Sequence, residues 1–517
     1  MLFNSYAFIA GFVPAVLVAC LIAGRAGGAR AVLAVLLGAS VFFYGWWDAR
    51  YVLLLGGSIV VNFVLGLWLA SGPLRERRAA RHLVLIAGVA FNLALIAYFK
   101  YADFAIQTAN AVFGTDAGLL HVVLPLGISF FTFQQIAYLV DVARGGVADR
   151  SFVSYALFVT FFPQLIAGPI VHHGEMMPQF RAHGAALRLD DFAAGLTMFA
   201  IGLFKKAVLA DGVAPYATAA FAASEAGQTL DAVAAWGGAL AYTAQLYFDF
   251  SGYCDMAVGA ARLFGIRLPA NFDSPYKATS IQDFWRRWHM TLSRFLRDYV
   301  YIPLGGNRHG AARRHVNVVL TMLIGGLWHG ANWTFVVWGG LHGLMLALQG
   351  LWQAHGPRRA GPPTWLERRA AHLATFLFVV VAWVFFRAPT FAGAAAMLEG
   401  MAGLNGVELP SAVRHAAPAL AAGLEPLGVR FTGGGGAAFL ATWAWVAALL
   451  AIALLAPNSQ QILRRARPVI GSDDVAAPRA PALAWSRSPA WACATGLVLA
   501  IGILALTEVS EFLYFQF

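Results

Sequence analysis

The sequence has few charged residues. Only 12% of its 517 residues are Asp, Glu, Lys or Arg, while 60% are hydrophobic and the mean hydropathy is +0.66. Soluble globular proteins carry about 25% charged residues, so this chain is too poor in charge to cover a water-facing surface. Apolar runs recur from end to end, and many reach the roughly 18 residues needed to cross a bilayer. The composition therefore excludes a soluble protein and predicts an all-α polytopic membrane protein.

Cysteine is also scarce. Cys20, Cys254 and Cys493 lie in apolar surroundings without paired spacing, which excludes a disulfide framework and gives no metal-ligand pattern. The sequence contains neither the HExxH spacing of a zinc site nor a GxSxG serine elbow. We therefore expect no metal and no bound cofactor. Cys254 could be an acyl-carrying nucleophile, but no adjacent base is evident and this reading is disfavoured.

The net charge of +11 does not indicate nucleic-acid binding, because the arginines cluster in short gaps between apolar runs. These clusters lie at 75–81, 358–359, 368–369 and 463–467. By the positive-inside rule, 71–81, 353–369 and 457–488 are cytoplasmic, and 48–50, 100–118 and 388–436 are external. Both termini are then periplasmic, and membrane lipids are the expected surroundings.

Hydropathy predicts eleven to fourteen membrane segments. They are centred on residues 5–23, 31–47, 50–70, 82–99, 119–140, 151–170, 192–210, 233–249, 251–265, 316–330, 332–352, 370–387, 437–456 and 489–506. Because Pro125, Pro163 and Pro169 interrupt the stretch from 119 to 170, part of it is expected to be re-entrant. No internal repeat is evident, which weakens a transporter interpretation.

Polar side chains concentrate between residues 245 and 343, where a lipid-facing helix would reject them. They are Asp249, Asp255, Asn271, His289, His329 and His342. Ionisable groups at membrane depth are costly, and they indicate either a functional site or a structural pair.

Residues 284–299 predict a basic amphipathic helix at the cytoplasmic interface. His289 falls at the edge of its apolar arc and points inward. On helix geometry alone, an interfacial helix whose His289 simply forms a hydrogen bond to a neighbour is favoured over a catalytic role.

Residues 316–333 are apolar on every side until Trp328, His329 and Asn332. Their glycines allow close approach of other backbones, and a single histidine there could be an interhelical bridge. However, His329 follows His289 by 40 residues, and a turn at 302–307 could bring the two together. His342 is read as a structural partner. Transfer of an acyl group to a hydroxyl needs a base near neutral pH, an oxyanion donor and exclusion of water, and a buried imidazole pair can supply the first two.

The strings around these histidines resemble the membrane-bound O-acyltransferase family. They are LPLGISFFTFQQIAYLVD at 124–141, FFPQLIAGPI at 161–170, QLYFDFSGYCDMAVG at 245–259, NFDSPYKATSIQDFWRRWHMTLSRFLRDYVYIPLGGNR at 271–308 and GGLWHGANWTFVVWGGLHG at 325–343. They cover the central half of the chain in order. The length and the C-terminal spans look most like the alginate O-acetylation branch, and the teichoic-acid D-alanylation branch fits less well.

The resemblance implies a single membrane domain over 1–517 in which tilted helices form a ring around a central tunnel. Residues 1–118 are its N-terminal helices, 119–352 its catalytic core and 353–517 its C-terminal helices with the external loop 388–436. It implies that His329 of the WHG motif is catalytic and that His289, which ends the FWxxWH motif, is the second active-site residue. The candidate substrate-binding residues are Trp328, Asn332, Asp249, Ser251, Asn271, Trp285 and His342.

The resemblance further implies an inner-membrane O-acetyltransferase that uses cytoplasmic acetyl-CoA as the acyl donor. The acetyl group would reach an exopolysaccharide such as alginate through periplasmic partners of the SGNH type. Arg286, Arg287, Arg294 and Arg297 could attract the donor phosphates, although anionic lipid explains them equally well. Acylation of peptidoglycan, cellulose, teichoic acid or a lipid is the alternative within the class. A proton-coupled transporter or flippase is the alternative outside it.

Overall fold

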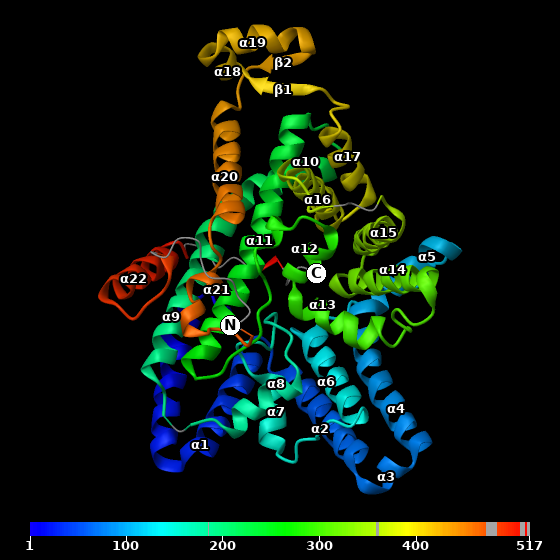
Figure 1. Cartoon of the computed structure of the whole chain (residues 1–517), viewed down its shortest axis with the longest axis vertical. Helices are drawn as coiled ribbons and strands as arrows, with labels where there is room; N and C mark the ends of the chain where they lie inside the picture. Colours follow the sequence, from blue (N-terminus) through cyan, green and yellow to red (C-terminus); the bar gives the residue numbers. More distant parts are fainter. Residues whose placement is uncertain (185, 358–360, 472–482, 507–511, 514–517) are drawn as a thin grey trace.

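A computed structural model describes residues 1–184, 186–357, 361–471, 483–506 and 512–513 (Figure 1). Residues 472–482 of the predicted loop 457–488, the arginine cluster at 358–359 and the C-terminal residues 514–517 lie outside this description.

The chain folds almost entirely as helices, and their bounds are as follows. The N-terminal helices are α1 (Val13–Gly45), α2 (Arg50–Ala70), α3 (Gly72–Glu76), α4 (Arg78–Ile96) and α5 (Ala102–Phe113). The central helices are α6 (Ile128–Ala143), α7 (Phe152–Thr160), α8 (His173–Arg181), α9 (Leu189–Phe204), α10 (Asp211–Glu225), α11 (Ala232–Leu263), α12 (Ile281–Arg287), α13 (Met290–Leu296), α14 (Gly310–His329) and α15 (Trp333–His355).

The C-terminal elements are α16 (Trp365–Arg387), α17 (Phe391–Met401), β1 (Val407–Pro410), α18 (Ser411–Ala416), α19 (Pro418–Leu424), β2 (Val429–Thr432), α20 (Gly436–Leu455), α21 (Ser459–Ile462) and α22 (Pro489–Leu504). Four π-helical turns are η1 (Ala7–Phe12), η2 (Ala97–Tyr101), η3 (Lys205–Ala210) and η5 (Arg297–Tyr301). Three short 3₁₀ turns are η4 (Pro275–Lys277), η6 (Glu425–Leu427) and η7 (Arg464–Ala466).

Seven helical segments in the described part of the chain are long and apolar enough to cross a membrane. They are Ala7–Gly45, Arg50–Ala70, Arg78–Phe113, Leu189–Glu225, Trp333–His355, Trp365–Arg387 and Gly436–Leu455. The prediction of an all-α polytopic membrane protein is confirmed. The first of the seven contains a sharp bend at Gly28, where φ is 66° and ψ is −159°, and the bend falls between the predicted spans 5–23 and 31–47. Glycine adopts a positive φ readily because it has no Cβ.

The predicted spans 233–249 and 251–265 are wrong as separate spans, because both lie in the single 32-residue helix α11. Polar residues near its middle lower the local hydropathy without interrupting the backbone. The helix packs closely against α9: a Cβ at Gly202 would lie 2.6 Å from the carbonyl oxygen of Gly252, and one at Gly259 would lie 2.6 Å from that of Gly195. This contact removes α11 from lipid along most of its length, so its polar side chains need not face hydrocarbon.

The segment from 119 to 170 is less helical than its hydropathy suggests. Residues 115–125 are irregular and α6 begins at Ile128, while α7 ends at Thr160. Residues 161–171, with Pro163 and Pro169, are non-helical yet buried, as a re-entrant segment at membrane depth must be. The predicted external loop 388–436 is not irregular: it contains α17, α18 and α19 with a parallel β1–β2 pair in which Val407 lies opposite Val429, and its external position stays a prediction.

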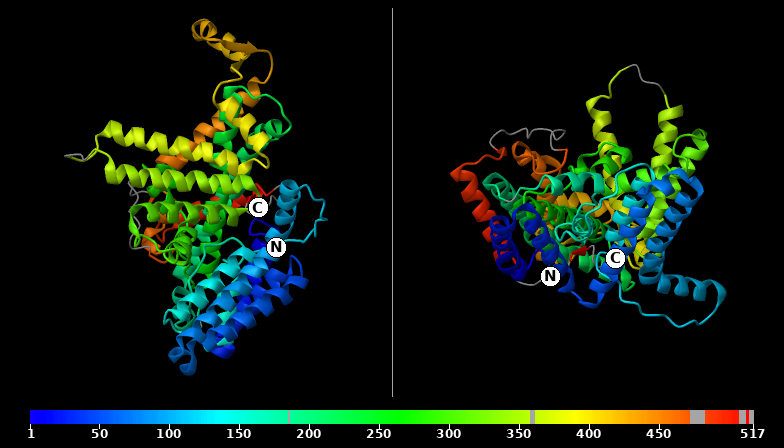
Figure 2. Two further views of the ribbon diagram at one scale, coloured as in Figure 1. Left: turned by 90° about the vertical axis from the view of Figure 1, so that its right-hand side faces the viewer. Right: turned by 90° about the horizontal axis from the view of Figure 1, so that it is seen from below.

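The helices end on different sides of the molecule. In the left panel of Figure 2, the adjoining ends of α15 and α16 extend to the left and α5 lies on the right, while the end of the N-terminal helices that carries α3 lies at the bottom. The side of the membrane on which 71–81, 353–369 and 100–118 lie stays a prediction.

Candidate active site

The predicted continuous helix over 284–299 is wrong. Ser280 caps α12, which ends at Arg287, and α13 begins at Met290. Trp288 between them is extended, and His289 is left-handed with φ 44° and ψ 52°. Such a conformation is costly for a residue with a Cβ and persists only where its surroundings enforce it. As a result His289 is fully buried, at 0% exposure, rather than lying at the edge of a helical face.

His329 is the last residue of α14 and is also buried. The centroid of its ring lies 6.2 Å from that of His289, so the two histidines do come together as predicted. The connection runs through the turn at 302–307, where Gly305 and Gly306 adopt positive φ values of 110° and 53°. A side chain at Gly305 would be strained in that conformation and would place its Cβ 2.7 Å from the His309 ring.

Aromatic rings surround the pair and connect it to the third histidine. His329 meets the Trp338 ring edge-on at a centroid distance of 5.1 Å, and Trp338 in turn lies 4.9 Å from His342. The indole nitrogen of Trp285 donates to Nδ1 of His342 at 3.2 Å. Trp328 stacks on Phe133 with 5.2 Å between centroids and lies beside both His289 and His329. Trp328 and Trp338 therefore lie against the histidine pair, and Trp285 and His342 pack behind Trp338.

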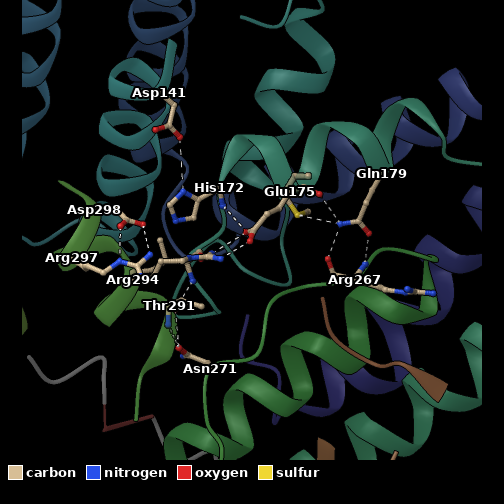
Figure 3. Close-up of polar contacts among 12 residues, drawn as sticks. Asp141, His172, Glu175, Gln179, Arg267, Asn271, Thr291, Arg294, Arg297 and Asp298 are labelled. Atoms are coloured by element: carbon tan, nitrogen blue, oxygen red, sulfur yellow. Dashed lines mark hydrogen bonds and ion pairs between the residues drawn. The ribbon is translucent and has the colours of Figure 1, made fainter. Parts of the chain in front are cut away.

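Asn271 holds His289 by a hydrogen bond that defines its tautomer. The Oδ1 atom of Asn271 accepts from the Thr291 amide at 3.2 Å and from the Thr291 hydroxyl at 2.8 Å, which fixes Oδ1 as the acceptor end of the amide (Figure 3). His289 Nδ1 lies 3.1 Å from the same oxygen, so Nδ1 is the protonated nitrogen. The lone pair of Nε2 is then the one able to accept a proton. Asn271 also donates to Cys254 Sγ at 3.1 Å.

Replacing Asn271 with Leu is expected to lower the acyl-transfer rate per folded molecule by about 100-fold, the lower range for a positioned acid–base group. The leucine removes the acceptor that orients the His289 ring. Asn271→Asp keeps an acceptor oxygen and should retain more activity. The matched control is Asn62→Leu, since Asn62 forms a buried amide pair with Asn92 in the N-terminal helices. Asn62→Leu should reduce protein yield but leave the rate per folded molecule unchanged. A normal rate in Asn271→Leu would contradict the role given to Asn271.

Lys100 is a site residue that the sequence did not reveal. Its Nζ donates to the carbonyl oxygens of Trp328 at 2.6 Å and of His329 at 3.1 Å, where the end of α14 leaves carbonyls without helical partners. Lys100 and His329 also line one cavity of about 290 Å³, together with residues 124–130. Because 228 residues separate Lys100 from Trp328, no local pattern could have connected them.

Three predicted substrate-binding residues lie in other surroundings. Asp249 faces the ammonium group of Lys206, with 2.7 Å between Oδ1 and Nζ. Ser251 is buried on the same helix. Asn332 caps α15 by accepting from the Thr334 amide, and it donates to the carbonyl oxygen of Pro389. These contacts account for Asp249 and Asn332 as structural groups.

Carboxylates neutralise most of the predicted basic face. Arg287 pairs with Asp283, Arg294 with Glu175 and Arg297 with Asp298, while Arg286 is exposed. Beside them, the Tyr299 hydroxyl donates to Asp141 at 2.8 Å, and burial together with this carboxylate raises the pKa of Tyr299. Figure 3 shows the Arg294–Glu175 and Arg297–Asp298 pairs near Asn271 and Thr291. The attraction of donor phosphates to these arginines remains a prediction.

The structure thus places a buried pair of imidazoles inside a multi-pass helical membrane protein. Residues 143–388, which include both histidines, match the model of the membrane-bound O-acyltransferase family. The chain is 47% identical to the peptidoglycan O-acetyltransferase of Helicobacter pylori, over 72% of this chain and 74% of that protein. It is 44% identical to the probable alginate O-acetylase AlgI of Pseudomonas putida, over 78% of this chain and 80% of that protein.

Similarity to the teichoic acid D-alanyltransferase of Streptococcus thermophilus is weaker, at 28% identity over 44% of this chain and 57% of that protein. The chain belongs to the membrane-bound O-acyltransferase family and is an O-acyltransferase. The resemblance seen in the sequence is confirmed.

Proposed function

We propose that this enzyme takes an acetyl group from cytoplasmic acetyl-CoA and passes it across the inner membrane for O-acetylation of an envelope polysaccharide. The observation that carries the proposal is the buried His289–His329 pair, in a chain similar to acetylases of two such polymers. The acetyl group would leave the membrane through a periplasmic partner of the SGNH type. Both termini are proposed to face the periplasm.

The proposed reaction moves one proton from the attacking hydroxyl to an imidazole and then from the imidazole to the departing thiolate. An imidazole accepts the proton of the attacking hydroxyl as its oxygen bonds to the acetyl carbon, and the carbon–sulfur bond then breaks. The proton passes to the departing thiolate, so CoA leaves as the thiol. His329 is proposed as this base because it lines the cavity that also reaches Lys100. His289 is proposed to share the proton or to hold the acceptor hydroxyl, and the support for this is that Asn271 holds its Nδ1.

Two acceptor polymers are each supported by a relative. The alginate acetylases favour an exopolysaccharide, and the peptidoglycan O-acetyltransferase favours the cell wall. Deletion of the gene followed by measurement of ester-linked acetate on both isolated polymers distinguishes them. We expect one polymer to lose its acetate and to regain it on complementation. Unchanged acetate on both polymers would overturn the proposal.

The transfer itself is testable in proteoliposomes loaded with radiolabelled acetyl-CoA. An acyltransferase should release free CoA in step with the appearance of label on an external acceptor. Movement of a solute without CoA release would instead support the transporter interpretation.

A further inference from the structure

A second polar cavity lies between α8, the beginning of α9 and the end of α11. Its volume is about 610 Å³. Residues 467–471 close one side of it, held in place by a bridge between Pro269 and Ile470. The charged side chains that line it are Arg188, Arg262, Arg267, Arg467, Glu175 and Asp191.

Among the lining residues that the structure describes, Arg188 and Arg267 have no carboxylate partner, and both lining carboxylates are already engaged. Asp191 pairs with Arg262 at 2.7 Å, and Glu175 pairs with Arg294, which lies outside the cavity lining. His183 also lines the cavity, but burial lowers its pKa below the usual value, so its imidazole is neutral at pH 7. The cavity therefore carries excess positive charge that comes from arginine alone.

Arg262 supplies a donor that needs an acceptor. The residue is 6% exposed, and its buried Nε has no hydrogen-bond partner among the residues that the structure describes. A buried donor left unsatisfied is costly, and an anionic oxygen in the cavity would satisfy it. The Nη2 atom of Arg262 already pairs with Asp191, so the arginine side chain is held in position before any ligand binds.

The wall that carries Arg267 is fixed by a reciprocal pair of hydrogen bonds. The Arg267 amide donates to Gln179 Oε1 at 2.8 Å, and Gln179 Nε2 donates back to the Arg267 carbonyl oxygen at 2.9 Å (Figure 3). This bond anchors the loop after α11 to α8. A fixed backbone at Arg267 reduces the ordering cost of binding at this wall of the cavity.

We propose that this arginine cavity binds a phosphate group. Guanidinium forks match the geometry of phosphate oxygens and bind them through two parallel hydrogen bonds. In the right panel of Figure 2, the orange segment that contains α21 lies toward the top, as do the adjoining ends of α15 and α16, the side expected to be cytoplasmic. Two sources can present a phosphate there: a soluble phosphate ester and the headgroup of an anionic phospholipid.

The test uses the full-length protein in phosphatidylcholine nanodiscs and measures binding rather than transfer, so its result is independent of the proposed acetylation. Adenosine 3′,5′-bisphosphate is the soluble probe, titrated by thermophoresis. Phosphatidylglycerol is the lipid probe, with retained lipid counted by native mass spectrometry. The test variant is Arg188→Gln combined with Arg267→Gln, which leaves the Arg262–Asp191 pair intact. The control is Arg430→Gln on the external β1–β2 segment, where Arg430 pairs with Glu408.

We expect the double variant to bind one of the two probes at least tenfold more weakly, as the loss of charge-assisted hydrogen bonds predicts, and the control to bind as the parent does. Weaker binding of the bisphosphate identifies a soluble ligand, and loss of retained phosphatidylglycerol identifies a lipid. If neither probe binds, or if the double variant and the control bind alike, the proposal is wrong.

Discussion

Replacing His329 with alanine is expected to lower the rate of acyl transfer by about 1,000-fold or more, the range for a positioned acid–base group. The imidazole is buried at the end of α14, 6.2 Å from His289, and lines the cavity that reaches Lys100. Alanine leaves the reacting hydroxyl without a proton acceptor. The measurement is CoA release per molecule of enzyme in purified membranes, with protein level determined by immunoblot.

The controls for His329 separate chemistry from packing. His329→Gln fills most of the space of the imidazole without its basicity, and it should be as inactive as His329→Ala. His415→Ala changes an exposed histidine of α18 and should keep the parent rate. A rate within tenfold of the parent for His329→Gln would show that the imidazole is not the base.

The helical architecture could be predicted because the composition of a segment is enough to indicate that it crosses a membrane. Apolar length predicts a span whatever its neighbours are, and arginine clusters predict the side on which a loop lies. The predictions were wrong where tertiary packing determines the backbone conformation. Helical periodicity favoured an unbroken helix through Trp288 and His289, but burial of both residues among aromatic rings favours a break with a left-handed His289.

The two candidate catalytic histidines were identified from motifs, but their supporting residues were not. Asn271 looked like a substrate ligand, whereas its amide instead holds His289 and Thr291. Lys100 had no visible role, because its hydrogen bonds reach the far end of α14. Both roles depend on contacts between segments distant in sequence, which single-sequence patterns do not contain.

Removing the ammonium group of Lys206 is expected to destabilise the protein by about 3–5 kcal/mol, because it leaves a buried charge without its partner. Lys206 and Asp249 are each 2% exposed at the side chain and lie 2.7 Å apart. Asp211 also pairs with Lys206, but its side chain is 26% exposed, so water can replace the lysine there. The measurement is thermal unfolding of Lys206→Met in detergent. The control is Arg297→Met, whose more exposed pair with Asp298 should contribute about 1 kcal/mol or less.

The double variant Lys206→Met with Asp249→Leu decides what Asp249 does. If the pair is structural, replacing both charges with apolar groups should recover most of the stability, since the remaining carboxylate is no longer buried alone. The rate per folded molecule should then stay near that of the parent. A double variant as unstable as Lys206→Met would contradict the ion-pair account. A stable double variant without activity would instead make Asp249 a substrate ligand, as the sequence pattern had indicated.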